Sequence, residues 1–188
     1  MKLAIAGLVL VSLLSSTSAV AYPGMDQQAQ KQQYSTIDQV KVLPKPYPID
    51  VVAFSDQNGK AIDFSQYKGK LIMVNMWATW CPPCVRELPA LADLSKHFDP
   101  KQFVLLPVSI DAEGVKQVKP FLQKMSLANF ESYYDPTQQL GQVFPLDTIP
   151  ATFILNNKGQ LVAFARSFVD WSDPQAIKLV ESLINQPS

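Results

Sequence analysis

Residues 69–84 read Gly-Lys-Leu-Ile-Met-Val-Asn-Met-Trp-Ala-Thr-Trp-Cys-Pro-Pro-Cys, an apolar run that leads directly into a pair of cysteines. The run at residues 71–77 is almost continuously apolar, which is typical of a strand buried on both faces of a sheet. Apolar residues then recur at helical spacing over residues 84–98, and Asp99-Pro100 marks the end of that pattern. The cysteines therefore lie between a buried strand and the start of a helix.

The sequence contains two cysteines, Cys81 and Cys84, and both belong to this Cys-Pro-Pro-Cys motif. The start of a helix presents partial positive charge and free N–H groups to the first sulfur, which favours the thiolate that attacks disulfides. We therefore predict that Cys81 is the nucleophile and that Cys84, on the inward face of the helix, is the less exposed, resolving thiol. The alternative, half of a metal site, is disfavoured because no second cysteine pair exists. No cofactor beyond this redox-active disulfide is predicted.

Pro82 and Pro83 lie between the cysteines and carry no N–H. The first turn of the helix therefore offers fewer hydrogen-bond donors to the Cys81 sulfur. A thiolate that is less stabilised makes the pair a weaker oxidant, so the motif predicts a reductase rather than a donor of disulfides.

The rest of the chain alternates strand and helix patterns around this motif. The predicted elements are a hairpin of residues 51–54 and 61–64, a strand at 103–110, a helix at 115–125, a hairpin of 151–155 and 161–165, and a final helix opened by Asp173-Pro174. Such an order predicts an α/β fold with a mixed central sheet flanked by helices and an added N-terminal hairpin. Pro107 lies inside a predicted strand, so a bulge or a missing ladder bond is expected there.

The N-terminal part of the chain has a different composition. Lys2 precedes an apolar run and then Ala19-Val20-Ala21, the pattern of a secretory signal peptide (residues 1–21) that is cleaved after residue 21. An uncleaved membrane anchor and a buried core helix are the alternatives. Residues 22–47 are rich in Gln and Pro and are predicted to form a tether, because they bury little apolar surface. Residues 48–188 are predicted to form one domain.

The charged residues exclude several classes of function. The sequence has 16 Lys+Arg, 16 Asp+Glu and one histidine, so its net charge is zero. Nucleic-acid binding, which needs a basic excess, is therefore not expected. His97 lies near the end of the first predicted helix, where it is expected to be a surface cation rather than a ligand.

Residues 69–84, together with Glu87 and Pro89, resemble the TlpA/ResA-like branch of the thioredoxin superfamily, which is related to the AhpC/TSA proteins. The resemblance covers about residues 48–185. It implies a thioredoxin fold and a thiol–disulfide oxidoreductase that reduces disulfides in the bacterial periplasm, for example in cytochrome c maturation. It also implies disulfide-containing periplasmic proteins as clients and a membrane thiol carrier of the DsbD or CcdA type as electron donor. The protein is expected to be a monomer.

The resemblance assigns a role to Glu87, one turn after Cys84. The family places a functional glutamate at this spacing, and a carboxylate there would exchange a proton with Cys84. From the sequence alone, Glu87 is an ordinary exposed helix residue. Asn75 supports the assignment, because it occupies the position of a buried aspartate in thioredoxin and cannot titrate.

The resemblance also predicts residues that contact substrate. Ile149-Pro150 matches the family's cis-proline segment, which lies beside the cysteines and pairs with the substrate backbone. Thr148 departs from the family, which commonly has glycine at that position, so the resemblance does not by itself fix how this loop meets substrate.

Two tryptophans precede the cysteines. Trp80 is predicted to shield the Cys81 sulfur and, with Pro82 and Pro83, to offer a surface to substrate, whereas Trp77 is expected to fill core.

Two other functions are weighed against this prediction. A copper-binding, Sco-like metallochaperone for respiratory oxidase assembly is the main alternative, but that family uses a longer cysteine spacing and a distant histidine, and His97 lies in the wrong element. A peroxidase relative would need a proline and a threonine around a single cysteine, and only Thr79 is present.

Overall fold

The computed structural model describes residues 35–186. The predicted signal peptide and the first part of the predicted tether lie outside these residues. Within residues 35–186, no helix is long and apolar enough to cross a bilayer.

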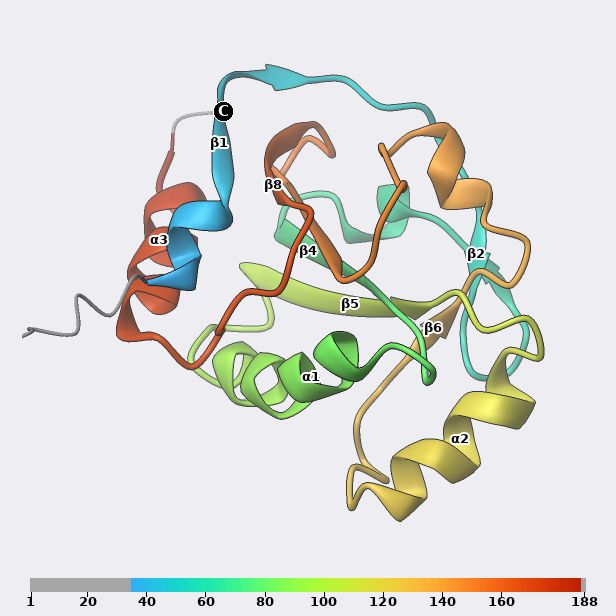
Figure 1. Cartoon of the computed structure of the whole chain (residues 1–188). Helices are drawn as coiled ribbons and strands as arrows, with labels where there is room; N and C mark the ends of the chain where they lie inside the picture. Colours follow the sequence, from blue (N-terminus) through green and yellow to red (C-terminus); the bar gives the residue numbers. More distant parts are fainter. Residues whose placement is uncertain (1–34, 187–188) are drawn as a thin grey trace, which may run out of the picture. The chain divides into compact units, whose positions relative to one another are not determined.

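The described residues form one eight-stranded sheet with the strand order β1-β8-β7-β4-β5-β6-β2-β3 (Figure 1). The strands are β1 (Lys41–Tyr47), β2 (Phe54–Ser55), β3 (Ala61–Ile62), β4 (Leu71–Trp77), β5 (Phe103–Ser109), β6 (Tyr133–Tyr134), β7 (Ala151–Leu155) and β8 (Leu161–Ala165). The helices are α1 (Pro82–Ser95), α2 (Val115–Lys124) and α3 (Pro174–Ile184), with 3-10 turns at Thr36–Gln39, Phe64–Tyr67 and Gln139–Gln142. The predicted mixed α/β sheet is confirmed.

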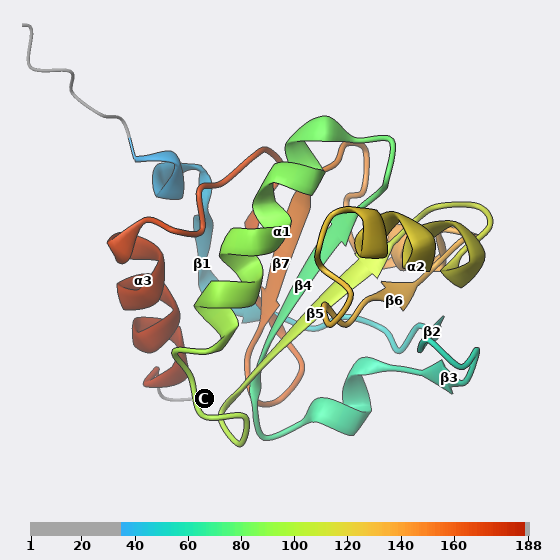
Figure 2. The same ribbon diagram turned by 90° about the horizontal axis from the view of Figure 1, so that it is seen from below.

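The central strand β4 has the predicted bounds, and all seven of its residues are buried. It pairs in parallel with β5 and antiparallel with β7. Met73 packs in the hydrophobic cluster that includes α3. On the same face of β4, Asn75 bonds to Glu87 of α1 and Trp77 packs against Phe121 of α2, so the three α-helices lie on one side of the sheet (Figure 2).

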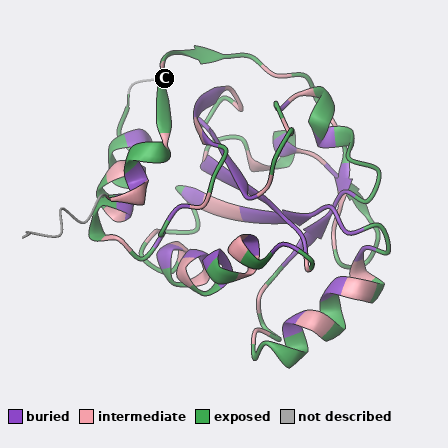
Figure 3. Ribbon diagram, viewed as in Figure 1, coloured by how far each residue is buried: buried purple, intermediate pink, exposed green. Residues whose placement is uncertain are grey.

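Val74, on the other face of β4, belongs to the cluster that includes Phe64 and Leu140 of two 3-10 turns. Buried residues concentrate on the central strands (Figure 3). Each buried apolar side chain of this size contributes roughly 1.5–3 kcal/mol to stability.

Helix α1 starts at Pro82, so it begins at the cysteine motif as predicted, and it ends at Ser95, before the predicted apolar pattern ends at residue 98. Proline is favoured in the first turn of a helix because its missing N–H has no partner there and its fixed φ suits the helix. The hairpin of β7 and β8 and the start of α3 have the predicted bounds, with Asp173 as the N-cap of α3. The N-terminal hairpin is present as β2 and β3 but shorter, because Phe64 begins a 3-10 turn.

The predicted boundary between tether and domain at residue 47 is wrong. Strand β1 pairs antiparallel with β8 and forms one edge of the sheet, and Ile37 before it is buried. Pro44 and Pro46 argued against a strand, but proline is tolerated on an edge strand. The side chains of β1 are mostly exposed, so its sequence carries no alternating apolar pattern. The domain therefore includes the described part of the segment, from residue 35.

Of the two outcomes expected at Pro107, a bulge or a missing ladder bond, the structure shows no bulge. The parallel register between β4 and β5 runs unbroken from Leu71 opposite Phe103 to Trp77 opposite Ser109. The Pro107 carbonyl accepts the Ser132 hydroxyl on the side of β6. Because N–H and C=O of one strand residue point to the same side, the missing N–H also faces that side, where the pairing with β6 begins only at the next residue.

Candidate active site

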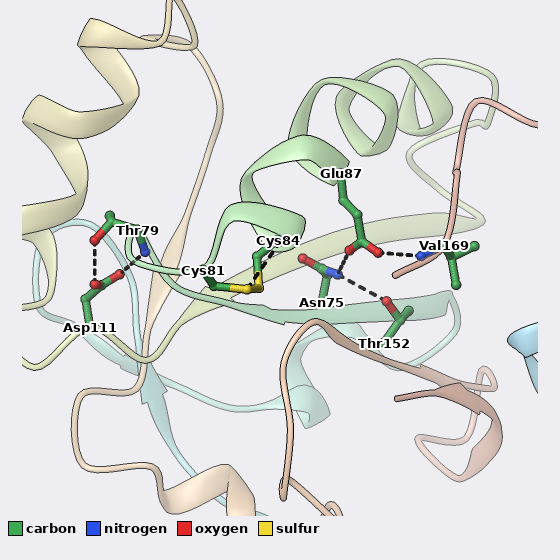
Figure 4. Close-up of a disulfide and its surroundings, with 8 residues drawn as sticks. All are labelled: Asn75, Thr79, Cys81, Cys84, Glu87, Asp111, Thr152 and Val169. Carbon is green, nitrogen blue, oxygen red and sulfur yellow. Dashed lines mark hydrogen bonds between the residues drawn. A yellow bond between two sulfur atoms is a disulfide. The ribbon is translucent and has the colours of Figure 1, made fainter. Parts of the chain in front are cut away.

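Cys81 and Cys84 form a disulfide at the start of α1, with their Cα atoms 5.3 Å apart (Figure 4). Cys81 is the N-cap of the helix, and its sulfur accepts the backbone N–H of Cys84 at 3.3 Å. Because Pro82 and Pro83 have no N–H, this is the first backbone donor within the helix. Cys81 is 5% exposed and Cys84 is 0% exposed, so the predicted order of exposure is confirmed.

Glu87 lies on the inward face of α1 and is only 1% exposed, so it is not the exposed helix residue that sequence alone suggests. One carboxylate oxygen accepts the Asn75 side-chain amide at 3.0 Å, and the other accepts the backbone N–H of Val169 at 2.7 Å. Burial raises the pKa of Glu87 to about 7, although both hydrogen bonds and the nearby Arg86 charge act to lower it. The carboxyl group is therefore poised to gain or lose a proton near neutral pH.

Asn75 connects Glu87 to the neighbouring strand. Its Nδ2 donates both to Glu87 and to the Thr152 hydroxyl, the latter at 3.1 Å. Asn75 and Thr152 are register partners of β4 and β7, so the pairing of these strands brings the two side chains together. The Asn75 side chain is fully buried, and its Oδ1 has no hydrogen-bond donor among the described residues.

A second buried carboxylate, Asp111, lies on the other side of the cysteines and was missed by the sequence reasoning. It is 0% exposed and accepts the Thr79 N–H at 2.9 Å and the Thr79 hydroxyl at 2.7 Å. Ser109 and Gln117 donate to the same carboxylate, each at 2.8 Å. These four hydrogen bonds fix the backbone two residues before Cys81. Polar residues directly after the buried strand β5 were the available sequence signal.

The predicted substrate-contacting residues lie at the same edge of the sheet. The Ile149–Pro150 peptide bond is cis, as the resemblance predicts. Pro150 directly precedes Ala151, which pairs with Met76 near the end of β4. Register therefore places the cis-proline beside the segment that leads into Cys81.

The two tryptophans differ in the way that was predicted. Trp80 is 63% exposed next to Cys81, whereas Trp77 is 0% exposed and packs against Phe121 with ring centroids 6.4 Å apart. Pro82 is exposed and Pro83 is partly buried, so both are near the surface that Trp80 presents.

The loop between β8 and α3 makes further contacts with the elements around the cysteines. Arg166 Nη1 donates to both carboxylate oxygens of Asp147, close to the cis-proline, at 2.9 and 3.1 Å. Arg86 lies over the Phe168 ring at 5.4 Å from its centroid. Both pairs link this loop to the elements that carry the cysteines and the cis-proline.

Within residues 35–186, no cluster of three His, Cys, Asp or Glu side chains is placed to hold a metal ion. His97 lies past the end of α1 and is exposed, as expected for a surface residue. The chemistry that this arrangement supports is exchange between a dithiol and a disulfide, with an ionisable carboxyl group close to the buried cysteine.

Comparisons with known proteins agree with this geometry. A sequence model of the AhpC/TSA family matches residues 46–164. The thiol-disulfide oxidoreductase ResA of Bacillus subtilis (strain 168) is 34% identical over 107 residues, which are 57% of this chain and 59% of that protein. ResA of Bacillus thuringiensis subsp. konkukian is 27% identical over 131 residues, which are 70% of this chain and 73% of that protein. The chain thus spans less than two thirds of the first relative's length.

Solved structures share the fold. A DsbF homologue from Corynebacterium diphtheriae matches with a TM-score of 0.64 and 19% identity, over 89% of this chain and 100% of that chain. StoA from Bacillus subtilis matches with a TM-score of 0.58 and 23% identity, over 71% of this chain and 99% of that chain. The shared architecture is the thioredoxin fold, as the sequence predicts.

Proposed function

The chain belongs to the AhpC/TSA family, and on that premise we propose that it is a thiol–disulfide oxidoreductase that reduces disulfides in other proteins. The observation that carries the proposal is the Cys81–Cys84 disulfide at the start of α1, with Cys81 as the N-cap. The similarity to ResA proteins, which are named thiol-disulfide oxidoreductases, supports the same activity.

In the proposed reaction the reduced protein acts first through Cys81. Its thiolate attacks one sulfur of a client disulfide, the client S–S bond breaks, and the second client sulfur leaves as a thiolate that takes up a proton. Cys84 then loses its proton and attacks the Cys81 sulfur, which releases the reduced client and forms the Cys81–Cys84 disulfide. The client gains two electrons and the protein loses two. Glu87, one turn from Cys84, is proposed to take the Cys84 proton.

The reducing direction is supported by the hydrogen bonds to Cys81. The two prolines provide no N–H, and the backbone donor to the sulfur is the Cys84 N–H at 3.3 Å. Sparse stabilisation of the Cys81 thiolate makes the dithiol a stronger reductant.

The setting proposed for this reaction is the periplasm. The signal-peptide pattern of residues 1–21 and the resemblance to the TlpA/ResA-like branch support export. Clients would be disulfide-containing periplasmic proteins, such as those of cytochrome c maturation. A membrane thiol carrier of the DsbD or CcdA type would supply the electrons.

The test is the reduction of a protein disulfide, such as those of insulin, by the purified protein in the presence of a chemical dithiol. Cys81→Ser is expected to abolish the catalysed rate, and Cys84→Ser to accumulate a mixed disulfide without turnover. His97→Ala, a change at an exposed position past the end of α1, serves as the control and keeps the rate. Reduction by Cys81→Ser at the wild-type rate would refute the proposal.

The direction has its own measurement, which is the redox potential of the Cys81–Cys84 pair. A value of about −120 mV, typical of strongly oxidising enzymes, would overturn the assignment as a reductase but not the proposed thiol–disulfide exchange. Clients are identified by expressing Cys84→Ser in cells, because this variant holds the client on Cys81. A variant that traps no periplasmic protein would contradict the proposed setting.

A further inference from the structure

The side chain of Asn75 presents a buried acceptor without a donor. Its Oδ1 is one of two side-chain N or O atoms within residues 35–186 that are buried and have no hydrogen-bond partner. Asn75 is 0% exposed, so its Oδ1 is shielded from solvent. A buried polar atom without a partner costs free energy, so its persistence in a site of this kind calls for a function.

The orientation of the Asn75 amide is fixed by its other end. Nδ2 lies between a Glu87 oxygen at 3.0 Å and the Thr152 hydroxyl at 3.1 Å. A carboxylate can only accept hydrogen bonds, so the NH₂ group rather than the carbonyl must face Glu87 when that group is charged. Oδ1 is therefore turned away from Glu87.

Cys84 lies on the side of Asn75 that Oδ1 faces. Cys84 and Glu87 are three residues apart on the same buried face of α1, so their side chains are neighbours. Figure 4 shows the Asn75 side chain pointing from β4 towards α1, with its nitrogen on the Glu87 side and its oxygen on the side of the disulfide. Within the disulfide, the Cys84 sulfur carries no hydrogen and cannot donate to this oxygen.

We propose that Asn75 Oδ1 accepts a hydrogen bond from the Cys84 thiol in the reduced protein, so that Asn75 joins Glu87 to Cys84 in that state only. The inference rests on the proposed function, because it concerns the same redox pair. Asn75 keeps both Nδ2 hydrogen bonds in the two states. Its oxygen gains a partner only when the disulfide is reduced.

The step that creates this bond balances as follows. A thiolate of a donor dithiol attacks the Cys81 sulfur, the Cys81–Cys84 bond breaks, and its electron pair leaves on Cys84. Cys84 takes up one proton and becomes the S–H group that donates to Asn75. The second donor thiolate then attacks the mixed disulfide, which releases Cys81 as a thiolate and the donor as a disulfide. The protein has gained two electrons.

The first experiment observes the bond directly. In the Cys81→Ser protein Cys84 is the single thiol, and its infrared S–H stretching band moves to lower wavenumber when the thiol donates a hydrogen bond. We expect the band at lower wavenumber than that of a thiol in an apolar solvent. Adding Asn75→Ala should return it to the unbonded position. Adding Thr152→Val instead, which removes only a partner of Nδ2, should leave it in place.

A band at the unbonded position in the Cys81→Ser protein itself would overturn the inference. This result needs no substitution at Asn75, so it does not depend on whether Asn75→Ala folds. A band that is unmoved by Asn75→Ala in a folded protein would overturn it equally. Neither result bears on whether the wild-type protein reduces insulin, so the proposed function stands or fails separately.

The second experiment measures the equilibrium of the intact cysteine pair with dithiothreitol. Asn75→Ala removes a hydrogen bond from the reduced form and an unpaired acceptor from the disulfide form. Both effects favour the disulfide, and we expect the equilibrium constant for oxidation to rise roughly three- to tenfold. Thr152→Val should change it less than about twofold. An unchanged constant, or a shift towards the dithiol, would contradict the inference.

Discussion

The most unusual ionisable residue of the site is Glu87. It is buried on the inward face of α1, and burial raises its pKa to about 7 from 4.5. Two hydrogen-bond donors, Asn75 and the backbone of Val169, hold its carboxylate, which forms no ion pair with any residue that the structure describes. A carboxyl group in such surroundings is protonated in an appreciable fraction of molecules at neutral pH, which suits an acid or base for the neighbouring thiol.

This raised pKa makes a prediction about stability. Between about pH 4.5 and about pH 7 the folded protein holds the Glu87 proton more tightly than the unfolded chain, so the contribution of Glu87 to stability falls as the pH rises through this range. In Glu87→Gln that fall is absent. The unfolding free energy of the variant minus that of the wild type should therefore rise by up to about 3 kcal/mol from low to high pH.

Urea unfolding at a series of pH values checks this expectation. Glu181→Gln, a substitution at an exposed position of α3, is the control and should follow the wild-type profile in parallel. If Glu87→Gln also runs parallel to the wild type, Glu87 does not titrate near neutral pH.

The sequence could predict the position of Glu87 but not its surroundings. Its spacing from Cys84 and the family resemblance pointed to a role in proton transfer. Its burial depends on the loop that contains Val169, which is 82 residues further along the chain. No local pattern reports such a contact, so the sequence suggested an exposed residue.

At the scale of elements, the strand–helix junction at the cysteines is held by a network that spans three segments. Asp111 after β5 and Gln117 in α2 both bond to Thr79, between β4 and α1. The Asp111 carboxylate is satisfied by four hydrogen bonds and has no ion-pair partner among the described residues. The network positions the turn that carries Trp80 and Cys81.

We predict that Asp111→Asn lowers both stability and the reduction rate. An amide NH₂ in place of one oxygen must face donors, which leaves buried N–H or O–H groups unpaired and costs roughly 2–4 kcal/mol. The reduction of insulin should slow because the Cys81 turn loses its fixed geometry. Urea unfolding and initial rates measure the two effects.

Asp135→Asn provides a matched control for this prediction. Asp135 is also buried and accepts two backbone N–H groups, but it caps the 3-10 turn Gln139–Gln142 rather than the cysteine turn. We expect it to lower stability without slowing reduction under folding conditions. Equal slowing by both variants would show that the Asp111 network contributes only stability.

The elements themselves were predicted unevenly, and the reason is physical. Strand β4, the hairpin of β7 and β8, and the start of α3 follow from apolar runs, Asn157-Lys158-Gly159 and the Asp173 cap, all of which are local signals. Strand β1 has exposed side chains and two prolines, and only its pairing with β8 makes it a strand. Pairing partners distant in sequence are not visible in a local pattern.

At the scale of the whole molecule, residues 35–47 are part of the folded domain. The 3-10 turn Thr36–Gln39 buries Ile37, and β1 covers the edge of β8. The Ser35 hydroxyl bonds to the Asp173 carboxylate, and Thr36 accepts the backbone N–H of Asp170.

We predict that a chain beginning at residue 48 is less stable than one beginning at residue 34. It loses the burial of Ile37, which contributes roughly 1.5–3 kcal/mol, and leaves the edge of β8 unpaired and prone to association. Urea unfolding and light scattering compare the two chains. Equal stability and equal solubility would show that β1 is dispensable and that the boundary expected from sequence is adequate.

The hydrogen bond from Asp170 to Thr36 affects Glu87 as well as the stability of the domain. Asp170 directly follows Val169, whose N–H holds the Glu87 carboxylate, so the first described turn of the chain steadies a group that lies beneath the redox pair. The residue at which a recombinant form of this protein begins therefore also affects the protonation of Glu87. A shortened chain that still folds would carry a different proton affinity at Glu87, and its pH–rate profile would describe the shortened chain rather than the full-length protein.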